Sequence, residues 1–341
     1  MRQTDTHLRA RKALPFIEAI RDLRPGLISP PLVERMNRIV RELRRGGRKW
    51  SELVHNLVAK SKIEYAYHTI AIEGNTLTFD QTRKVIEEGL TVEGKTVREH
   101  LEAVNIPKAL DSLMSLAKVS RPLTVNDVLM IHDLVTHGIA EAEPGKSRSG
   151  FVGLTGSTYL PPPAYEVPFL IEEMVKGLNT NPNDLSPTEL AFQSHLWLVS
   201  IHPFTDGKGR VARLLAALVL LKRGYLPVIV RVERRSRYIQ LLQRTQRTTR
   251  PNFRGYFNFM AREYIATLAM YSGGLSAKSP EEDIVLLSEA GKKAGLDDEY
   301  LGLLARRGLI PAVKRGSRWY IREKDLTEYI IRRKRSGTPV R

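Results

Sequence analysis

Residues 186–224 (SPTELAFQSHLWLVSIHPFTDGKGRVARLLAALVLLKRG) contain the signals for two helices joined by a short glycine-rich loop. The first four residues form a capping box with proline at the first helical position, and they predict a helix that runs to about Ile201. After the loop, apolar residues recur at helical spacing and stop near Gly224. We therefore predict two buried helices, with the glycines placed where the second helix begins.

The loop between these helices has an unusual composition. Residues 202–210 (HPFTDGKGR) combine a histidine, an aspartate, two glycines and two cations, and Arg213 follows within one helical turn. Free backbone N–H groups and the positive end of the dipole make a helix start a ready site for phosphate. Arg210 and Arg213 share a helix face, where both could bind the phosphates of a nucleotide. The alternative is a polar loop between two core helices, since lone histidines and Gly-x-Gly turns are common.

Residues 202–213 resemble the signature of the Fic family, His-x-Phe-x-Asp/Glu-Gly-Asn-Gly/Lys-Arg followed by x-x-Arg. The match departs from that pattern at Lys208, where the family usually has asparagine. Fic proteins are mostly adenylyltransferases, which move AMP from ATP to a protein hydroxyl and release pyrophosphate. The resemblance covers roughly residues 30–265 and implies a mainly α-helical fold, a Fic-type helical bundle with a β-hairpin flap. It also implies a Ser, Thr or Tyr hydroxyl as the target, on another protein or on this chain.

The resemblance implies a role for each residue of the loop. His202 would be the general base that takes the proton of the target hydroxyl, because imidazole titrates near neutral pH. Asp206 would hold Mg²⁺ between the α- and β-phosphates of ATP, and Phe204 would anchor the loop. The phosphates would be bound by the backbone around Gly207, Lys208 and Gly209, by Arg210 at the leaving pyrophosphate and by Arg213 at the γ-phosphate.

A second motif lies upstream, in residues 69–75 (TIAIEGN). It matches the Ser/Thr-x-x-x-Glu-Gly/Asn inhibitory motif of many Fic proteins, with Thr69, Glu73 and Gly74 at the defining positions. In that resemblance Glu73 pairs with Arg213 and denies it to the γ-phosphate. Alone, this stretch would indicate an ordinary helix C-terminus with a left-handed glycine cap. Because both motifs occur in one chain, we interpret residues 69–75 as an inhibitory helix.

Two weaker features also fit a nucleotide site. Residues 145–163 (GKSRSGFVGLTGSTYLPPP) show alternation, glycines and a proline stop, which predict a short hairpin. The hairpin resembles the Fic flap and would place three ligand contacts at Leu154, Thr155 and Gly156. Tyr238 resembles the start of the family's Tyr-Tyr segment near the nucleoside. Gln246 stands where the family often has asparagine, so a contact of this residue with adenosine is an open question.

Composition restricts the class of protein. The 341 residues contain no cysteine, which excludes structural disulfides and thiolate metal sites and suits a reducing cytoplasm. The longest strongly apolar stretch, residues 214–221, is too short to span a bilayer. The N-terminal residues lack the apolar core of a secretory signal. We therefore expect a cytoplasmic protein with no membrane partner.

The chain is strongly basic. A formal charge of +17 arises from 54 Lys and Arg against 37 Asp and Glu, and an ATP site accounts for only a few of these cations. Basic clusters recur at residues 41–48, 231–237 and 332–335. Each cluster by itself indicates a solvated surface, whereas all of them together are also compatible with an acidic partner such as nucleic acid.

We predict four segments along the chain. Residues 1–115 form an N-terminal helical region with the inhibitory helix, residues 116–270 the catalytic core, residues 271–280 a linker, and residues 281–341 a small winged-helix domain.

In the C-terminal segment we expect helices over residues 284–294 and 297–307, two short strands over residues 310–321 and a closing helix over residues 324–331. Residues 306–326 resemble the winged helix-turn-helix of excisionase and MerR-like proteins. Basic wing residues such as Arg318 would face DNA phosphates, but the second helix begins with acidic residues that would repel DNA. A DNA partner and a protein partner therefore both stay open, as does a homodimer.

Two other functions stay open besides AMP transfer. Lys208 could change the nucleotide or the reaction, giving another phosphotransfer or the removal of AMP. Alternatively, the chain could be a DNA-binding regulator whose Fic site only senses a nucleotide.

Overall fold

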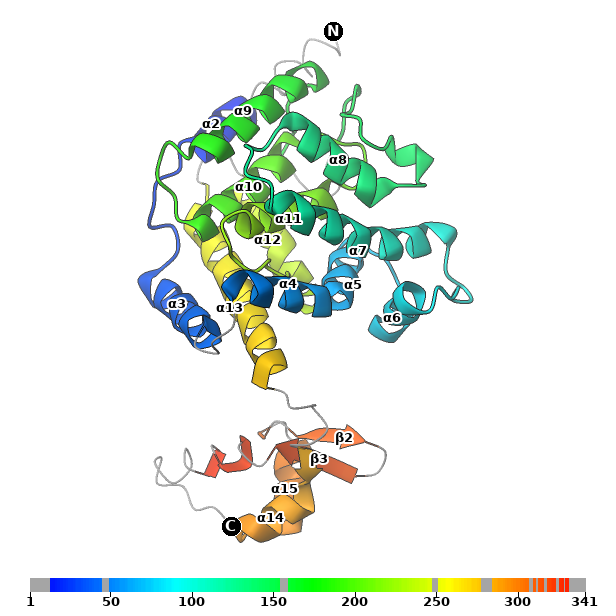
Figure 1. The fold of residues 1–341 in the computed structure, drawn as a ribbon, viewed down its shortest axis with the longest axis vertical. Coiled ribbons are helices and arrows are strands. Elements are labelled where there is room, and N and C mark those ends of the chain that lie inside the picture. The colour runs from blue at the N-terminus through cyan, green and yellow to red at the C-terminus, as the bar shows by residue number, and fades with distance from the viewer. Residues whose placement is uncertain are drawn as a thin grey trace. The chain divides into compact units, whose positions relative to one another are not determined.

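The computed structural model describes residues 13–44, 49–153, 159–246, 251–276 and 284–306, together with 309–310, 312–315, 318–322, 325–327 and 329–330. The chain divides into two compact units, Met1–Ser272 and Gly273–Arg341 (Figure 1). The predicted N-terminal region and catalytic core therefore pack within one unit.

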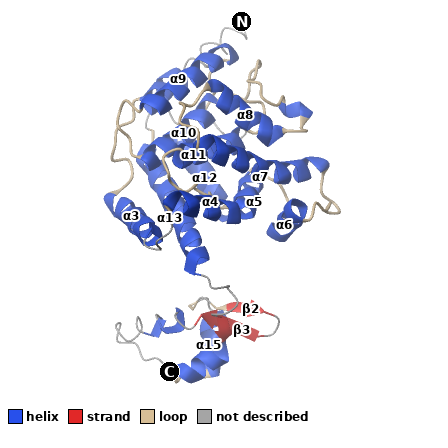
Figure 2. Ribbon diagram, viewed as in Figure 1, coloured by secondary structure: helices blue, strands red, loops and turns tan. Residues whose placement is uncertain are grey.

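The described residues of the first unit form helices and no strand (Figure 2). Its α-helices are α2 (Leu14–Arg21), α3 (Pro30–Arg44), α4 (Trp50–Lys60), α5 (Lys62–Ile72), α6 (Phe79–Glu87), α7 (Val97–Ala117), α8 (Val125–Thr136), α9 (Val167–Thr180), α10 (Pro187–Ile201), α11 (Lys208–Leu221), α12 (Arg235–Thr245) and α13 (Phe253–Ser276). Short 3₁₀ helices in the described part of this unit include η2 (Ala140–Ala142), η3 (Ala164–Glu166) and η4 (Val232–Arg234).

Helices α10 and α11 form the centre of this unit (Figure 1). The predicted capping box is present, because the Ser186 side chain accepts from the Glu189 backbone and the Glu189 side chain accepts from the Ser186 backbone. Every residue from Thr188 to Ile201 is buried, as expected of a helix covered on all sides. The two predicted helices are confirmed, and the loop between them lies where the sequence placed it.

The N-terminal helices α5 and α7 pack against α11. Helix α5 ends at Ile72, and Gly74 follows in a left-handed conformation (φ 103°), in agreement with the predicted glycine cap. The start of α12 is tied to this end, because Arg235 Nε donates to the Ile72 carbonyl at 2.6 Å. The Val232 N–H of η4 also donates to His68 Nδ1 at 3.2 Å. These contacts fix the end of α5 beside α12.

The described residues of the second unit include a three-stranded antiparallel sheet, two helices between its strands, and helical residues at 325–327 and 329–330, within the predicted closing helix. Strands β1 (Ile284–Leu286), β2 (Val313–Arg315) and β3 (Arg318–Arg322) pair in the order β1-β3-β2, and α14 (Leu287–Ala294) and α15 (Asp298–Arg306) lie between β1 and β2 in the chain. The two predicted strands and the second predicted helix are present. The helix predicted to begin at Ile284 begins three residues later. Its first residues, Ile-Val-Leu, pair with β3 instead, since a short apolar run fits a buried strand as well as a helix.

The boundary between the two units, at Ser272 and Gly273, falls inside the segment predicted as a linker, residues 271–280. Helix α13 continues through Gly273 and Gly274 to Ser276, since a cost of about 1 kcal/mol for each glycine is small against a long helix. The described parts of the predicted hairpin, residues 145–153 and 159–163, form no strand, and Leu154, Thr155 and Gly156 lie outside the described residues. The hairpin and the winged helix stay predictions.

Within the part of the chain that the structure describes, no helix combines the length and the apolar character needed to cross a membrane.

Candidate active site

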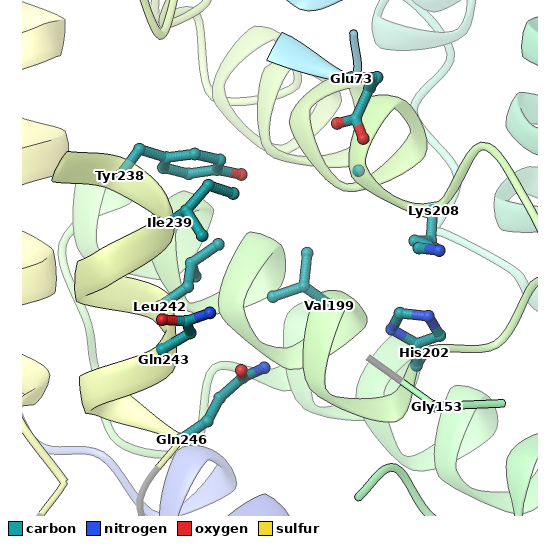
Figure 3. A pocket seen from close by; sticks show the side chains of 11 residues that line it. Glu73, Gly153, Val199, His202, Lys208, Tyr238, Ile239, Leu242, Gln243 and Gln246 are labelled. Atoms are coloured by element: carbon teal, nitrogen blue, oxygen red, sulfur yellow. The ribbon is translucent and has the colours of Figure 1, made fainter. Parts of the chain in front are cut away.

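His202 ends α10 in a left-handed backbone conformation (φ 54°, ψ 57°) that is uncommon for a residue with a side chain. Such a conformation costs free energy and persists only where surrounding contacts enforce it. The imidazole is buried and lines a pocket, and its Nε2 has no hydrogen-bond partner among the described residues (Figure 3). Burial, and then the nearby Lys208 charge, lower the pKa of His202 to about 3. The ring is therefore neutral near pH 7, with a lone pair available to accept a proton.

Arg148 holds the backbone around His202. Its guanidinium donates to the carbonyls of His202 at 2.7 Å, Gly150 at 2.8 Å and Pro162 at 2.6 Å, and its own N–H donates to the Pro203 carbonyl at 2.8 Å. The side chain is buried, and desolvation lowers its pKa. Arg148 thus joins the loop to both ends of the segment predicted as a flap. Arg148 was not predicted, because nothing in the local sequence pattern distinguishes it from a surface arginine.

Phe204 is fully buried and stacks on His132 of α8, with ring centroids 3.8 Å apart and an interplanar angle of 6°. The Gly145 N–H donates to His132 Nδ1 at 3.1 Å, so the proton of a neutral ring sits on Nε2, which lies 3.2 Å from the Asp206 carbonyl. Burial lowers the pKa of His132 to about 4, which favours this neutral form. Phe204 therefore has the environment expected of an anchor, and His132 fixes the loop at Asp206.

Gly207 is required by both its conformation and its surroundings. It has a φ of +71°, and a Cβ atom there would lie 2.8 Å from Thr136 Cγ2. Helix α11 begins directly after it, at Lys208, which lines the pocket beside His202 (Figure 3). The turn thus aims the start of α11 into the pocket, as a phosphate cradle requires.

Glu73 lies over this helix start. A Cβ at Gly209 would clash with the Glu73 carboxylate, so glycine is needed for the close approach. Glu73 also accepts from Arg213 Nη2 at 2.7 Å, and Thr69 accepts from the same guanidinium through Oγ1 at 2.7 Å and its carbonyl at 2.8 Å. Thr69 and Glu73 therefore both meet Arg213, as the inhibitory motif implies.

The charge of Arg213 is stabilised although the side chain is buried. Burial alone would lower its pKa, but Glu73 and the Tyr238 hydroxyl outweigh that effect and raise the pKa. Tyr238 is itself buried on α12, and its hydroxyl lies 2.7 Å from His195 Nε2. Tyr238 thus contacts the arginine as well as lining the pocket.

Arg210 and Asp206 belong to a neighbouring charge cluster. Arg210 is buried, and its Nη1 lies 3.0 Å from Glu102 Oε1 on α7, while its Nη2 lies 3.4 Å from Asp206 Oδ1. Burial would raise the pKa of Asp206, but Arg210, the Gly207 N–H and Arg98 stabilise the carboxylate and lower it overall. Asp206 is therefore ionised at neutral pH. Glu102 and Arg98 were not predicted.

The pocket has a volume of about 430 Å³. Six of the predicted site residues line it, namely Glu73, His202, Lys208, Gly209, Tyr238 and Gln246. Five other lining residues were not predicted, namely Gly153, Val199, Ile239, Leu242 and Gln243 (Figure 3). The α12 members recur at i, i+1, i+4 and i+5, a helical face that periodicity could have revealed from Tyr238. The wall they form is largely apolar, with amide groups at its end.

Comparison with known proteins agrees with this geometry. The sequence profile of the Fic/DOC family matches residues 122–220. The chain is 34% identical over 232 residues to "Protein adenylyltransferase fic-1" of Caenorhabditis briggsae, an alignment that covers 67% of this chain and 45% of that protein. A solved structure, "Fic-1 (aa134 - 508) from C. elegans", has a TM-score of 0.63 and 30% identity, with 74% of each chain covered. The chain belongs to the Fic/DOC family.

The Fic fold also extends to a more distant neighbour. A Fic domain containing signaling protein from Bacteroides thetaiotaomicron has a TM-score of 0.64 at 23% identity, over 73% of this chain and 99% of that one. The predicted mainly helical, Fic-type fold is confirmed. The chain spans less than half the length of the C. briggsae relative, 45% of it.

The loop geometry predicts that two glycines with similar φ angles differ in how much stability is lost when each is replaced by alanine. Gly207→Ala should lower the free energy of unfolding by about 2–4 kcal/mol, because strain at positive φ adds to a clash with Thr136. Gly94→Ala, at φ +74° in open space, should lower it by only about 1 kcal/mol. Urea titrations measure both, and Thr136→Ser should recover part of the loss in Gly207→Ala. Equal losses at the two glycines would contradict the close packing of the loop.

Proposed function

We propose that this Fic protein is a protein adenylyltransferase that transfers AMP from ATP to a Ser, Thr or Tyr hydroxyl of a protein, which includes its own chain. The observation that carries the proposal is the neutral imidazole of His202, which lines a pocket beside a glycine-rich helix start and whose Nε2 has no hydrogen-bond partner in the described part of the chain. Relatives named protein adenylyltransferase support it. In this proposal the apolar face of α12 receives the adenosine and the start of α11 receives the phosphates.

The proposed reaction is an in-line displacement at the α-phosphorus. The target hydroxyl oxygen forms a bond to this phosphorus, the bond to the oxygen bridging to the β-phosphate breaks, and pyrophosphate leaves. His202 Nε2 accepts the hydroxyl proton, which requires the neutral ring that burial provides. Arg210 and the N–H groups at the start of α11 balance the charge of the leaving group.

Asp206 fits a magnesium ion that is shared with the nucleotide. Among the described residues, no three His, Cys, Asp or Glu side chains gather into a group that could hold a metal. Mg²⁺ commonly uses one or two carboxylates, with water and substrate phosphates completing the octahedron. The ionised Asp206 carboxylate, partly exposed at the loop, would supply the protein ligand. When bound, Mg²⁺ would neutralise phosphate charge.

We further propose that Glu73 inhibits the enzyme. Its carboxylate lies over Gly209 and pairs with Arg213, so it occupies both the phosphate cradle and the arginine proposed to bind the γ-phosphate. A nucleotide that enters with Glu73 in place must therefore bind in an unproductive position.

Removal of the base tests the central proposal. His202→Ala should abolish AMP transfer while ATP affinity changes less than about threefold, because the imidazole acts on the target hydroxyl and not on the phosphates. Transfer can be followed with ATP labelled at the α-phosphate and automodification as the readout. The control is replacement of a histidine outside the site. His132 is unsuitable because it supports the loop, so the exposed His55→Ala is used. Full activity of His202→Ala would overturn the assignment.

Release of Glu73 tests the inhibition. Glu73→Gln keeps the shape of the side chain but removes its ion pair with Arg213. Glu73→Gly also removes the side chain from its position over the start of α11. Both should raise the rate of automodification, with Glu73→Gly the more active of the two. Adding Arg213→Ala should cancel the gain, whereas Glu64→Gln on the same helix should leave the rate near wild type. If Glu73→Gly is no faster than wild type at saturating ATP and Mg²⁺, the inhibitory role fails.

Lys208, where this chain departs from the usual Fic sequence, has two measurable effects. Lys208→Asn should weaken ATP binding by about tenfold or less at low salt, because one partly exposed cation is lost from the phosphate site. It should also raise the pKa of His202, since Lys208 contributes to lowering it. As the pH is lowered, His202 is then protonated at a higher pH than in the wild type, so the acid limb of the pH–rate profile shifts to higher pH. The exposed Lys176→Asn is the control. An unchanged affinity and profile would place the Lys208 side chain outside the site.

A further inference from the structure

Four charged side chains beside the loop form a closed ring of alternating charge. Arg98 pairs with Asp206 and, through Nε at 3.4 Å, with Glu102 Oε1. Arg210 pairs with the same two carboxylates, at 3.0 Å from Glu102 Oε1 and 3.4 Å from Asp206 Oδ1. Each carboxylate therefore contacts both guanidinium groups. The ring joins α7, which carries Arg98 and Glu102, to the loop and α11.

The inner and outer halves of this ring differ in their freedom to move. The side chains of Arg210 and Glu102 are 1% and 9% exposed, whereas those of Asp206 and Arg98 are 32% and 49% exposed. The buried pair is fixed by its surroundings, and a change of partner there would leave a charge uncompensated in the core. Arg98 can turn toward solvent at little cost. The Arg98–Asp206 contact is therefore the one at which the ring opens.

Glu102 is fixed by a further contact. Its Oε2 accepts from Asn75 Nδ2 at 2.9 Å, and the same amide donates to the Glu99 carbonyl at 3.1 Å. Asn75 directly follows Glu73 and Gly74, so this contact ties the carboxylate to the end of the inhibitory segment. Glu102 thus stays in place with one oxygen directed at both arginines, whatever happens at Asp206.

We propose that Arg98 is an internal counter-cation for Asp206 that a divalent metal must displace, and that Glu102 is the carboxylate that retains Arg98 when the metal binds. The inference rests on the proposed metal-binding role of Asp206. A divalent cation at Asp206 repels a guanidinium group on the same carboxylate. Because Arg98 already pairs with Glu102, it needs only to leave Asp206. Arg98 and Glu102 are thus positioning residues with opposite effects on metal binding.

The test measures how much Mg²⁺ tightens nucleotide binding. The full chain carrying His202→Ala and Glu73→Gly cannot transfer AMP, so a fluorescent ATP analogue can be titrated at equilibrium in EDTA and in Mg²⁺. The ratio of the two Kd values is the metal-dependent gain. Arg98→Gln should enlarge this gain by about three- to tenfold, as expected for one half-exposed ion pair. Arg98→Lys keeps the charge and should stay near the parent value.

Glu102→Gln should move the gain in the opposite direction. With its second partner neutralised, Arg98 pairs more strongly with Asp206 and the metal-dependent gain falls. A purely structural role for the Arg98–Glu102 pair would shift both variants in the same direction. If Glu102→Gln proves unfolded by circular dichroism, the contrast between Arg98→Gln and Arg98→Lys decides the matter alone.

Two further variants separate this inference from the proposed function. Arg83→Gln removes an equal charge from an exposed ion pair on α6 and should leave the gain unchanged. Asp206→Asn should abolish the gain in every background, and if it does not, Asp206 is not the metal ligand. If Asp206→Asn abolishes the gain but Arg98→Gln leaves it unchanged or smaller, the role of Arg98 is overturned and that of Asp206 stands.

Discussion

Helix α11 carries two buried guanidinium groups, Arg210 and Arg213, and most of the site is arranged around balancing their charges. Arg213 is balanced by Glu73 and Thr69 of the α5 segment, and Arg210 is balanced by Glu102 of α7. Removing one partner of a buried pair costs about 3–5 kcal/mol, because the remaining charge is left without compensation. The N-terminal helices α5 and α7 are therefore held against α11 by these ion pairs as well as by apolar packing.

This constraint links the proposed inhibition to stability. Without a nucleotide, the Glu73 carboxylate compensates the charge of Arg213. Because Arg213 is desolvated, any negative group that pairs with it is strongly favoured. The same burial therefore stabilises Glu73 in its position and would favour a bound phosphate. A γ-phosphate can replace it, because it brings more negative charge and several acceptor oxygens. In the proposed inhibition, the γ-phosphate that Glu73 excludes is thus also the group best able to displace it. The balance between the two states would therefore depend on which negative group pairs with Arg213.

Local signals in the sequence predicted the parts of the structure that depend on local contacts. The capping box at Ser186, the glycine cap at Gly74 and the two central helices follow from propensity and spacing over a few residues. The ion pair of Glu73 with Arg213, separated by 140 residues, was predicted only because the family resemblance supplied it.

The contacts that the sequence analysis missed have no local signature. Arg148 reaches the His202 carbonyl across 54 residues, and Arg98 reaches Asp206 across 108. In a chain with 54 basic residues, no pattern marks these two arginines as different from the solvated majority. The error at Ile284 has another cause, since three apolar residues acquire strand geometry only by pairing with β3, more than thirty residues later.

A buried hydrogen-bond chain would keep Arg213 in place if Glu73 moved away as proposed. The Tyr256 hydroxyl donates to the Phe192 carbonyl, so it must accept from His195 Nδ1, and the bare Nε2 of that ring then accepts from the Tyr238 hydroxyl. Burial lowers the pKa of His195 to about 3, which keeps the ring neutral and preserves this order of donors.

The order of donors leaves the Tyr238 oxygen free to face the guanidinium as an acceptor. Together with Thr69, it holds Arg213 from two sides that do not include the Glu73 carboxylate. Displacement of Glu73 therefore exposes an arginine that is already oriented, and little conformational entropy remains to be lost when a phosphate binds. The preorganisation of the proposed γ-phosphate site thus resides in α10, α12 and α13, which carry this chain, and in Thr69 at the start of the proposed inhibitory segment.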